Sequence, residues 1–331
     1  MKHRKLMVVS TLVTIGIIGA VAGLALYTNY SVKASAPSLP EALNSLPSDC
    51  QFLFGINVQK FVSSSAYAKF RQRQSQQIGN DLAAFIDKTG VDPARDIAYL
   101  VAAGRPGEKA KGEGVVIVTG RFNQSAITAY IRSKSTPIEM KYGGALVLMI
   151  PDPKNDAVER GVVFLDGGEI AMGDLESLKA VLDVGGKADK SILSNPAIAP
   201  LISSISPDEM FWFAGDAAGV LAKAPVSNPL GANISSIRNV VGILNITDAV
   251  TGKITVTAIN AESATKLADT VRGVVAFGQL AGDQNPDLKM LLGGLAISQT
   301  STQVSVALNF PTALLEKLEQ ARKTPRQTIT N

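Results

Sequence analysis

The sequence predicts an α+β protein in which two related units of antiparallel sheet, covered by helices, follow an N-terminal transmembrane helix. Three observations lead to this expectation: an uncharged apolar run near the N-terminus, short alternating strands separated by helical stretches, and a strand motif that occurs twice. The chain has 331 residues, of which 46% are hydrophobic and 18% charged. This length is enough for one large or two ordinary domains with a hydrophobic core.

The apolar run extends from Leu6 to Tyr27 and contains no charged residue. A helix of about 20 apolar residues spans the hydrocarbon core of a bilayer. The basic stretch "MKHRK" precedes the run, so the positive-inside rule places the N-terminus in the cytoplasm and the rest of the chain outside. We therefore expect a single-pass protein of the cell membrane, held by a signal-anchor, whose bulk lies in the periplasm or elsewhere in the cell envelope.

A cleaved signal peptide is the alternative to this anchor. The stretches "AVA" at 20–22 and "ASA" at 34–36 have the small residues of a cleavage site, but the apolar run is longer than is usual for a signal peptide. We favour the uncleaved anchor. Gly19 and Gly23 form a GxxxG pattern through which two such helices could pair in a homodimer.

The basic balance of the chain comes from the region before the first acidic residue, Glu41. Four of the 32 basic residues lie there, so the remaining 28 equal the 28 acidic residues. The chain from Glu41 onward is therefore neutral overall and offers no basic field for phosphates. We expect no nucleic-acid partner; the expected partners are the membrane, other envelope proteins or lipid.

A strand motif occurs twice without a gap. "PSDCQFLFGINVQKF" at 47–61 matches "SPDEMFWFAGDAAGV" at 206–220. The shared positions are an Asp, an FxF core and a polar residue at the strand end: Asp49 and Asp208, Phe52 and Phe211, Phe54 and Phe213, Asn57 and Asp216. We expect this motif to be the first strand of each unit, with its aromatic side chains in the core.

A second junction repeats in the same order. "VVIVTGRFNQSAITAYI" at 115–131 resembles "KITVTAINAESATKLADTV" at 253–271. In both, a strand leads to an asparagine, Asn123 or Asn260, that should cap a helix. Two motifs in the same order predict an internal duplication.

The division of the chain follows from these motifs. We expect a cytoplasmic flank and anchor at 1–27, a linker at 28–46, a first unit at 47–205, a second at 206–323 and a flexible tail at 324–331. The expected helices are 64–88, 123–134, 174–184, a short one near 217–223, 261–282 and a last one from Pro311. The expected strands include 50–57, 97–104, 115–122, 209–215, 238–246, 252–259 and 303–310.

Few residues are available for catalysis. The only histidine is His3, in the cytoplasmic flank, and the only cysteine is Cys50. These counts exclude a Ser-His-Asp triad, a His-containing zinc or haem site, and an intrachain disulfide in the outer part. We therefore expect no catalytic residue, cofactor or metal, and a buried Cys50.

One polar cluster, "TGVDPARDI" at 89–97, is a weak candidate site. Asp92 and Asp96 could hold a cation while Arg95 binds an anion. In the structural alternative, which we favour, the glycine ends a helix, Asp92 forms a turn with the following proline, and Arg95 pairs locally.

The N-terminal half resembles a known group of proteins. The basic start, the apolar run, "LPSDCQFLFGINVQKF" at 46–61 and "TGVDPARDI" at 89–97 are similar to those of uncharacterised membrane-anchored bacterial cell-envelope proteins of unknown function. The resemblance covers the anchor and most of the first unit. It implies a bacterial envelope location and transfers no catalytic residues.

Three functions are compatible with these features. We favour a membrane-anchored extracytoplasmic binding or scaffold module without catalytic activity. A carrier of an apolar ligand such as a lipid, held between sheet and helices, is the alternative, because helix 261–282 and segment 288–297 are rich in apolar and small residues. An enzyme that uses carboxylates is the third.

Overall fold

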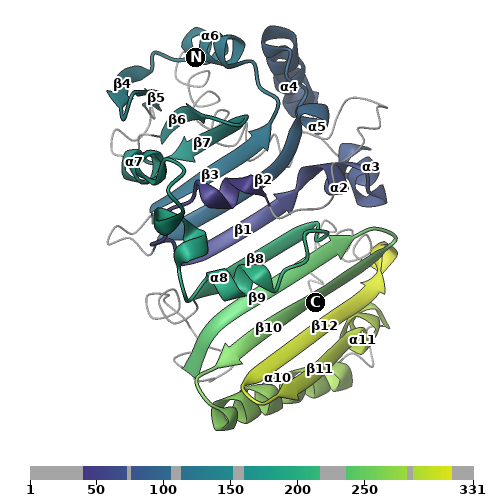
Figure 1. Cartoon of the computed structure of the whole chain (residues 1–331). Helices are drawn as coiled ribbons and strands as arrows, with labels where there is room; N and C mark the ends of the chain where they lie inside the picture. The colour runs from purple at the N-terminus through teal and green to yellow at the C-terminus, as the bar shows by residue number, and fades with distance from the viewer. Residues whose placement is uncertain are drawn as a thin grey trace, which may run out of the picture. The chain divides into compact units, whose positions relative to one another are not determined.

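A computed structural model describes residues 40–72, 76–105, 113–151, 160–216, 236–281 and 286–314 (Figure 1). The chain divides into two compact units, Met1–Gly215 and Asp216–Asn331. Each unit contains an antiparallel sheet with helices packed on it, so the predicted α+β class is confirmed.

The sheet of the first unit has the strand order β8-β1-β2-β3-β7-β6-β5-β4, and its pairings are antiparallel. The strands are β1 (Phe52–Asn57), β2 (Ile97–Arg105), β3 (Glu113–Gly120), β4 (Ile138–Tyr142), β5 (Ala145–Ile150), β6 (Arg160–Leu165), β7 (Glu169–Gly173) and β8 (Phe211–Asp216). Hairpin turns at Gly143–Gly144 and Gly167–Gly168 use positive φ angles, as the paired glycines predict.

Helices cover both faces of this sheet. They are η1 (Glu41–Asn44), α2 (Val58–Val62), α3 (Ser65–Gln72), α4 (Gln76–Thr89), α5 (Pro93–Asp96), α6 (Gln124–Lys134), α7 (Leu175–Val184), η2 (Ala188–Lys190), η3 (Ile192–Ser194) and α8 (Ala199–Ser203). On one face, α4 packs Leu82 against Leu100 and Val118, and α6 packs Ile127 against Leu148. The opposite face carries η1 and α7.

The sheet of the second unit has the order β11-β12-β10-β9. Its strands are β9 (Ile237–Ile246), β10 (Ala249–Ala258), β11 (Leu295–Thr300) and β12 (Gln303–Pro311). Helices α10 (Ala261–Ala281) and α11 (Pro286–Gly293) pack on one face. The chain path repeats that of the first unit: α10 follows β10 and the last strand returns beside β10, just as α6 follows β3 and β7 returns beside β3.

Two predicted caps, Asn123 and Asn260, are confirmed, and Asn57, which was expected only to end its strand, is a third. The side chains of Asn57, Asn123 and Asn260 each accept a hydrogen bond from a backbone N–H three residues later, at 2.9, 3.0 and 2.8 Å. Each satisfies one of the free amides at a helix start, at α2, α6 and α10 respectively. Gly90, with φ of +69°, follows the last residue of α4 as expected.

The two FxF strands pair with each other. β1 and β8 lie antiparallel with Phe54 opposite Phe213, Phe52 opposite Gly215 and Ile56 opposite Phe211. Equivalent residues of the two matched stretches differ by 159 in residue number. If each residue is replaced by its equivalent in the other stretch, the same set of pairs results: Phe52 opposite Gly215 becomes Phe211 opposite Ile56. A local two-fold axis therefore passes between Phe54 and Phe213. Because of this pairing, β8 belongs to the first compact unit, although the sequence predicts it to be the first strand of the second unit.

The prediction that the FxF aromatics lie in the core is wrong. Phe52 is 37% exposed, and Phe54, Phe211 and Phe213 are half-buried. Side chains alternate along a strand, and the buried positions next to these aromatics are Leu53, Gly55, Trp212 and Ala214. The spacing of the aromatics identified one face of the strand pair but not which face is covered.

Two helix predictions also differ from the structure. The region expected to be one helix at 64–88 contains α3 and α4 on either side of 73–75, and it is preceded by the short α2. The helix expected from Pro311 begins one residue later. Pro311 is the last residue of β12, opposite Ala249, where a proline at the end of a strand disturbs little of the ladder, and residues 312–314 are helical.

Several predicted segments lie outside the described residues: the anchor from Leu6 to Tyr27, the linker to residue 39, the short helix near 217–223 and the tail. In the described part of the chain, no helix has the length and apolar character needed to cross a bilayer.

Cys50 is buried, as predicted. Burial raises the pKa of its thiol to about 12, and the charge of Asp49 acts in the same direction. The thiol is therefore an inert packing group at neutral pH.

Gly55 and Trp212 form a close contact between β1 and β8. Trp212 is 1% exposed and lies directly over its partner Gly55, where an added Cβ would come within 2.1 Å of the indole ring. The indole N–H donates a hydrogen bond to the hydroxyl of Tyr99, whose pKa burial raises to about 12. Only a residue without a side chain fits beneath the ring.

Gly55→Ala should lower the free energy of unfolding by about 1–3 kcal/mol, because the methyl group must displace a fully packed indole. Trp212 is the single tryptophan, so its emission should shift to longer wavelength in the same variant. Gly79→Ala in α4 is the matched control, since nothing lies within 4 Å of the added Cβ; it should be neutral or stabilise by about 0.5–1 kcal/mol. Equal melting temperatures for the two variants would contradict the contact.

Candidate functional site

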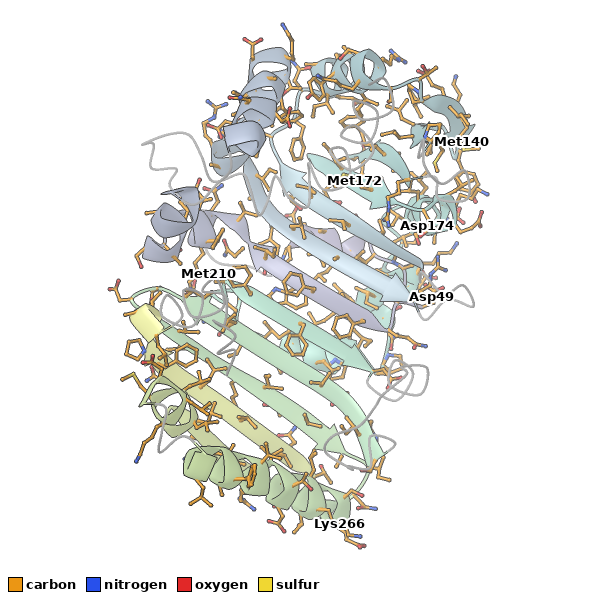
Figure 2. The ribbon with its side chains drawn as sticks, turned by 180° about the vertical axis from the view of Figure 1, so that it is seen from behind. Asp49, Met140, Met172, Asp174, Met210 and Lys266 are labelled. Atoms are coloured by element: carbon orange, nitrogen blue, oxygen red, sulfur yellow. The ribbon has the colours of Figure 1, made fainter. Side chains whose placement is uncertain are left out.

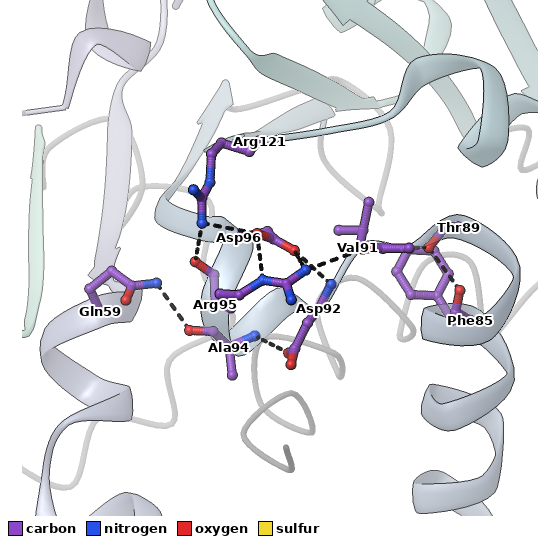
Figure 3. Close-up of polar contacts among 10 residues, drawn as sticks. Gln59, Phe85, Thr89, Val91, Asp92, Ala94, Arg95, Asp96 and Arg121 are labelled. Atoms are coloured by element: carbon purple, nitrogen blue, oxygen red, sulfur yellow. Dashed lines mark hydrogen bonds and ion pairs between the residues drawn. The ribbon is translucent and has the colours of Figure 1, made fainter. Parts of the chain in front are cut away.

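The candidate polar cluster occupies the junction between α4 and β2 (Figure 3). Asp92 caps the single turn α5 by accepting a hydrogen bond from the backbone N–H of Ala94 at 3.0 Å. Pro93 occupies the first position of that turn, where its fixed φ suits a helix start. The sequence "VDPARD" thus forms a capped turn that directs the chain into β2.

Asp96 is the centre of the cluster. Its carboxylate accepts hydrogen bonds from Arg95 Nε at 3.0 Å and Nη2 at 2.6 Å, a two-point contact with one guanidinium. It also accepts from the backbone N–H of Asp92 at 2.8 Å and from Arg121 Nη2 at 3.1 Å. The Asp96 side chain is buried, whereas both arginine side chains remain partly exposed.

The pKa values of Asp92 and Asp96 are shifted in opposite directions. Burial opposes the ionisation of Asp96, but the hydrogen bond from Arg95, the Asp92 amide and the charges of Arg95 and Arg121 outweigh it and lower its pKa. Burial raises the pKa of Asp92, and the hydrogen bond from Ala94 and the charge of Arg95 only partly offset this effect. Asp96 is therefore the ionised partner of the arginines.

Further hydrogen bonds join the cluster to its surroundings. Gln59 of α2 donates through Nε2 to the carbonyl of Ala94 at 3.1 Å and to that of Ile97. Arg95 Nη2 donates to the carbonyl of Gly90 at 3.3 Å, and Arg121 Nη2 to that of Arg95 at 3.4 Å. The cluster therefore connects α2, α4, the start of β2 and the end of β3.

These contacts account for Asp92, Arg95 and Asp96 without a ligand. Both carboxylates receive hydrogen bonds from protein groups, and Arg95 is paired within its own turn. Within the part of the chain that the structure describes, no group of three or more His, Cys, Asp or Glu side chains could hold a metal ion. The arrangement agrees with the structural alternative.

A second polar group, Glu169, was not anticipated from the sequence. Its side chain is buried at the start of β7 and accepts a hydrogen bond from the Ser45 hydroxyl at 2.7 Å. Thr119, which lies opposite it on β3, has a buried hydroxyl without a hydrogen-bond partner. Burial raises the pKa of Glu169, with a smaller contribution from Glu41, and the Ser45 hydrogen bond opposes the shift.

The third feature is the aromatic face, which we define as the side of β1 and β8 that carries Phe52, Phe54, Phe211 and Phe213. Phe52 stacks on Phe213 with ring centroids 6.1 Å apart. Phe211 meets Phe61 of α2 edge-on at 5.5 Å. Seen from behind in Figure 2, no described helix of the first unit lies across the middle of β1 and β8 on this side. The FxF repeat was the sequence signal for this surface.

Asp96→Asn should lower the free energy of unfolding by about 1–3 kcal/mol at neutral pH, because two arginines lose their charged partner and must be rehydrated. The pKa of Asp96 is lower in the folded state than in the unfolded state, where it is about 3.9. The stability that the Asp96 carboxylate contributes is therefore complete above the unfolded-state pKa and is lost as the pH falls through the folded-state pKa. The deficit should therefore shrink in acid. Asp87→Asn, in an exposed pair with Lys88, should change little; matching thermal melts of the two variants at pH 7 would refute the role of Asp96.

Glu169→Gln should raise the melting temperature at pH 7. The pKa of Glu169 is higher in the folded state than in the unfolded state, where it is about 4.3. The stability that this carboxyl group contributes is therefore complete below the unfolded-state pKa and is lost as the pH rises through the folded-state pKa. The amide keeps an acceptor for Ser45 without the charge, so its advantage should vanish near pH 4. The exposed Glu176→Gln is the control and should show no gain. A lower melting temperature for Glu169→Gln at pH 7 would mean that the buried charge is stabilising.

Comparisons with known proteins add little to this geometry. No protein-family profile and no curated protein matches the chain. Among solved structures, crystal form I of TP0453 aligns with a TM-score of 0.45 and 8% identity, over 87% of this chain and 98% of that one. Crystal form IV of TP0453 aligns with a TM-score of 0.47 and 11% identity, over 85% and 96%. Scores below 0.5 support no inference about function.

Proposed function

We propose that this chain is a membrane-anchored extracytoplasmic binding or scaffold module without catalytic activity. The observation that carries the proposal is the aromatic face of β1 and β8. Aromatic side chains on an open sheet face are typical of protein interfaces, where a few rigid rings supply most of the binding energy.

The rings of the aromatic face are held in place before any partner binds. Phe52 lies over Gly215, where an added Cβ would come within 2.4 Å of the ring, and it also stacks on Phe213. Phe211 is held by Phe61, which in turn meets Tyr67 edge-on at 5.7 Å. Because the rings are already ordered, a partner would lose little side-chain entropy on binding.

The location rests on sequence features. The uncharged run from Leu6 to Tyr27, its basic flank and the neutral remainder favour a single-pass anchor with the bulk of the chain outside. The resemblance to bacterial envelope proteins points to the same compartment. Gly19 and Gly23 would supply a homodimer contact within the membrane.

The same proposal includes an internal duplication of the outer part. It is supported by the two-fold register around Phe54 and Phe213, by the caps at Asn123 and Asn260, and by the repeated path from a helix to a returning last strand. Duplication explains why the FxF strand occurs twice.

A carrier of an apolar ligand is the second candidate. The half-buried side chains Val116 of β3 and Met172 of β7 lie opposite each other and continue the row that Phe54 and Ala102 begin. A row of apolar side chains across four strands could support an acyl chain.

A photo-crosslinking phenylalanine analogue at position 52 tests the proposal in the full chain in its own membrane. The expected result is one discrete adduct, which excess unmodified protein suppresses. The same analogue at Ile138, an exposed apolar residue on β4, is the control and should give no such adduct.

The mass of the adduct separates the two candidates: a protein-sized increase supports the scaffold, and a lipid-sized increase supports the carrier. Identical adducts from positions 52 and 138, or none from either, would count against both.

A further inference from the structure

The last turns of α10 are apolar on the side that faces away from the sheet. Phe277 and Leu280 are each 74% exposed. At 100° per residue, they lie roughly opposite Ala264 and Ala268, which are buried against the sheet of the second unit. Two large apolar side chains thus project from the outer side of a helix whose inner side is already packed.

The outer side of α10 is charged in the first half of the helix and uncharged in the second. Its first half carries the ion pairs Glu262–Lys266 and Asp269–Arg272; Lys266 is labelled in Figure 2. From Gly273 to Ala281 there is no charged residue. A helix on the surface of a soluble domain normally keeps a polar outer side. The second half of α10 departs from this pattern.

Helix α11 extends the apolar surface. An added Cβ at Gly278 of α10 would come within 2.8 Å of Leu292 Cδ1, so the two helices are in close contact. Leu291 packs into the core of the second unit, and its neighbour Met290 is 49% exposed. Val274, at 50% exposed, completes what we call the apolar end: Val274, Phe277, Leu280 and Met290.

We propose that the apolar end docks on the surface of a lipid bilayer, with Phe277 and Leu280 entering the boundary between headgroups and acyl chains. This inference rests on the anchor of the proposed function. The twelve residues 28–39 between the predicted anchor and Pro40 span at most about 40 Å. Pro40 therefore stays close to the bilayer, which raises the effective concentration of lipid at every surface of the chain.

Size and composition favour a bilayer over a protein. The four exposed side chains offer roughly 400 Å² of apolar surface, about half of the ~800 Å² that each partner buries in a standard protein interface. The stretch from Gly273 to Ala281 contains no Arg, Tyr or Trp, the usual interface anchors besides Phe. A bilayer requires neither shape complementarity nor polar partners.

Site-specific fluorescence in phosphatidylcholine vesicles tests the docking. The full chain is labelled at Leu280→Cys with an environment-sensitive dye, and lipids with a spin label high in the acyl chain serve as quencher. Native Cys50 is buried, so the dye goes to the introduced thiol. We expect a blue shift and quenching several-fold stronger than at Lys266→Cys, a control on the same side of α10. Adding Phe277→Asp should abolish the quenching at 280 without changing the circular dichroism spectrum.

Flotation of the same vesicles separates this inference from the anchor. Protein that floats but shows equal or no quenching at 280 and 266 would overturn the docking and leave the anchor intact. Quenching at 280 in protein that carbonate removes would support the docking and reject the anchor. Protein that does not float would overturn both. A blue shift without lipid quenching that grows with the protein-to-lipid ratio would mean that a second copy covers the apolar end, and would overturn the docking.

Discussion

The packing of Trp212 on Gly55 is the contact on which the first unit depends. A fully buried indole over a residue without a side chain fixes the register of β1 against β8, because a slip of one residue would place Phe54 or Ile56 under the ring. The hydrogen bond from Trp212 to Tyr99 extends the constraint to β2. Three strands are thus held in one register by one side chain.

This constraint also determines which surface is open. Since Trp212 and Leu53 occupy the covered face, the FxF aromatics must point to the other, where β1 and β8 remain partly accessible. The polar cluster around Asp96 fixes the start of β2 through hydrogen bonds that involve Arg95, Arg121 and Gln59. The packing of Trp212 therefore both stabilises the first unit and leaves the FxF rings on the accessible face of β1 and β8.

Local signals in the sequence predicted much of the fold. Asparagine caps and strand alternation each act over a few residues, so Asn123 and β12 were found where expected. The orientation of β1 could not be predicted, because both its faces are apolar and only β8, more than 150 residues away, decides which is covered. The same limit concealed Glu169: nothing near it in sequence shows that Ser45 lies above it. The pairing of Asp92, Arg95 and Asp96 with one another follows from their spacing, because these residues lie within one turn, whereas nothing near them in sequence shows that Gln59 and Arg121 join them.

The two-fold register of β1 and β8 has a consequence for the history of the chain. Strands related in this way form the kind of self-complementary edge by which two identical subunits join. If the repeats arose by duplication, their ancestor was a half-length protein that dimerised through this strand, and fusion converted a contact between molecules into one within a molecule. After fusion the two copies of the edge were free to diverge, which is how Leu53 in one copy came to correspond to Trp212 in the other, and Gly55 to Ala214.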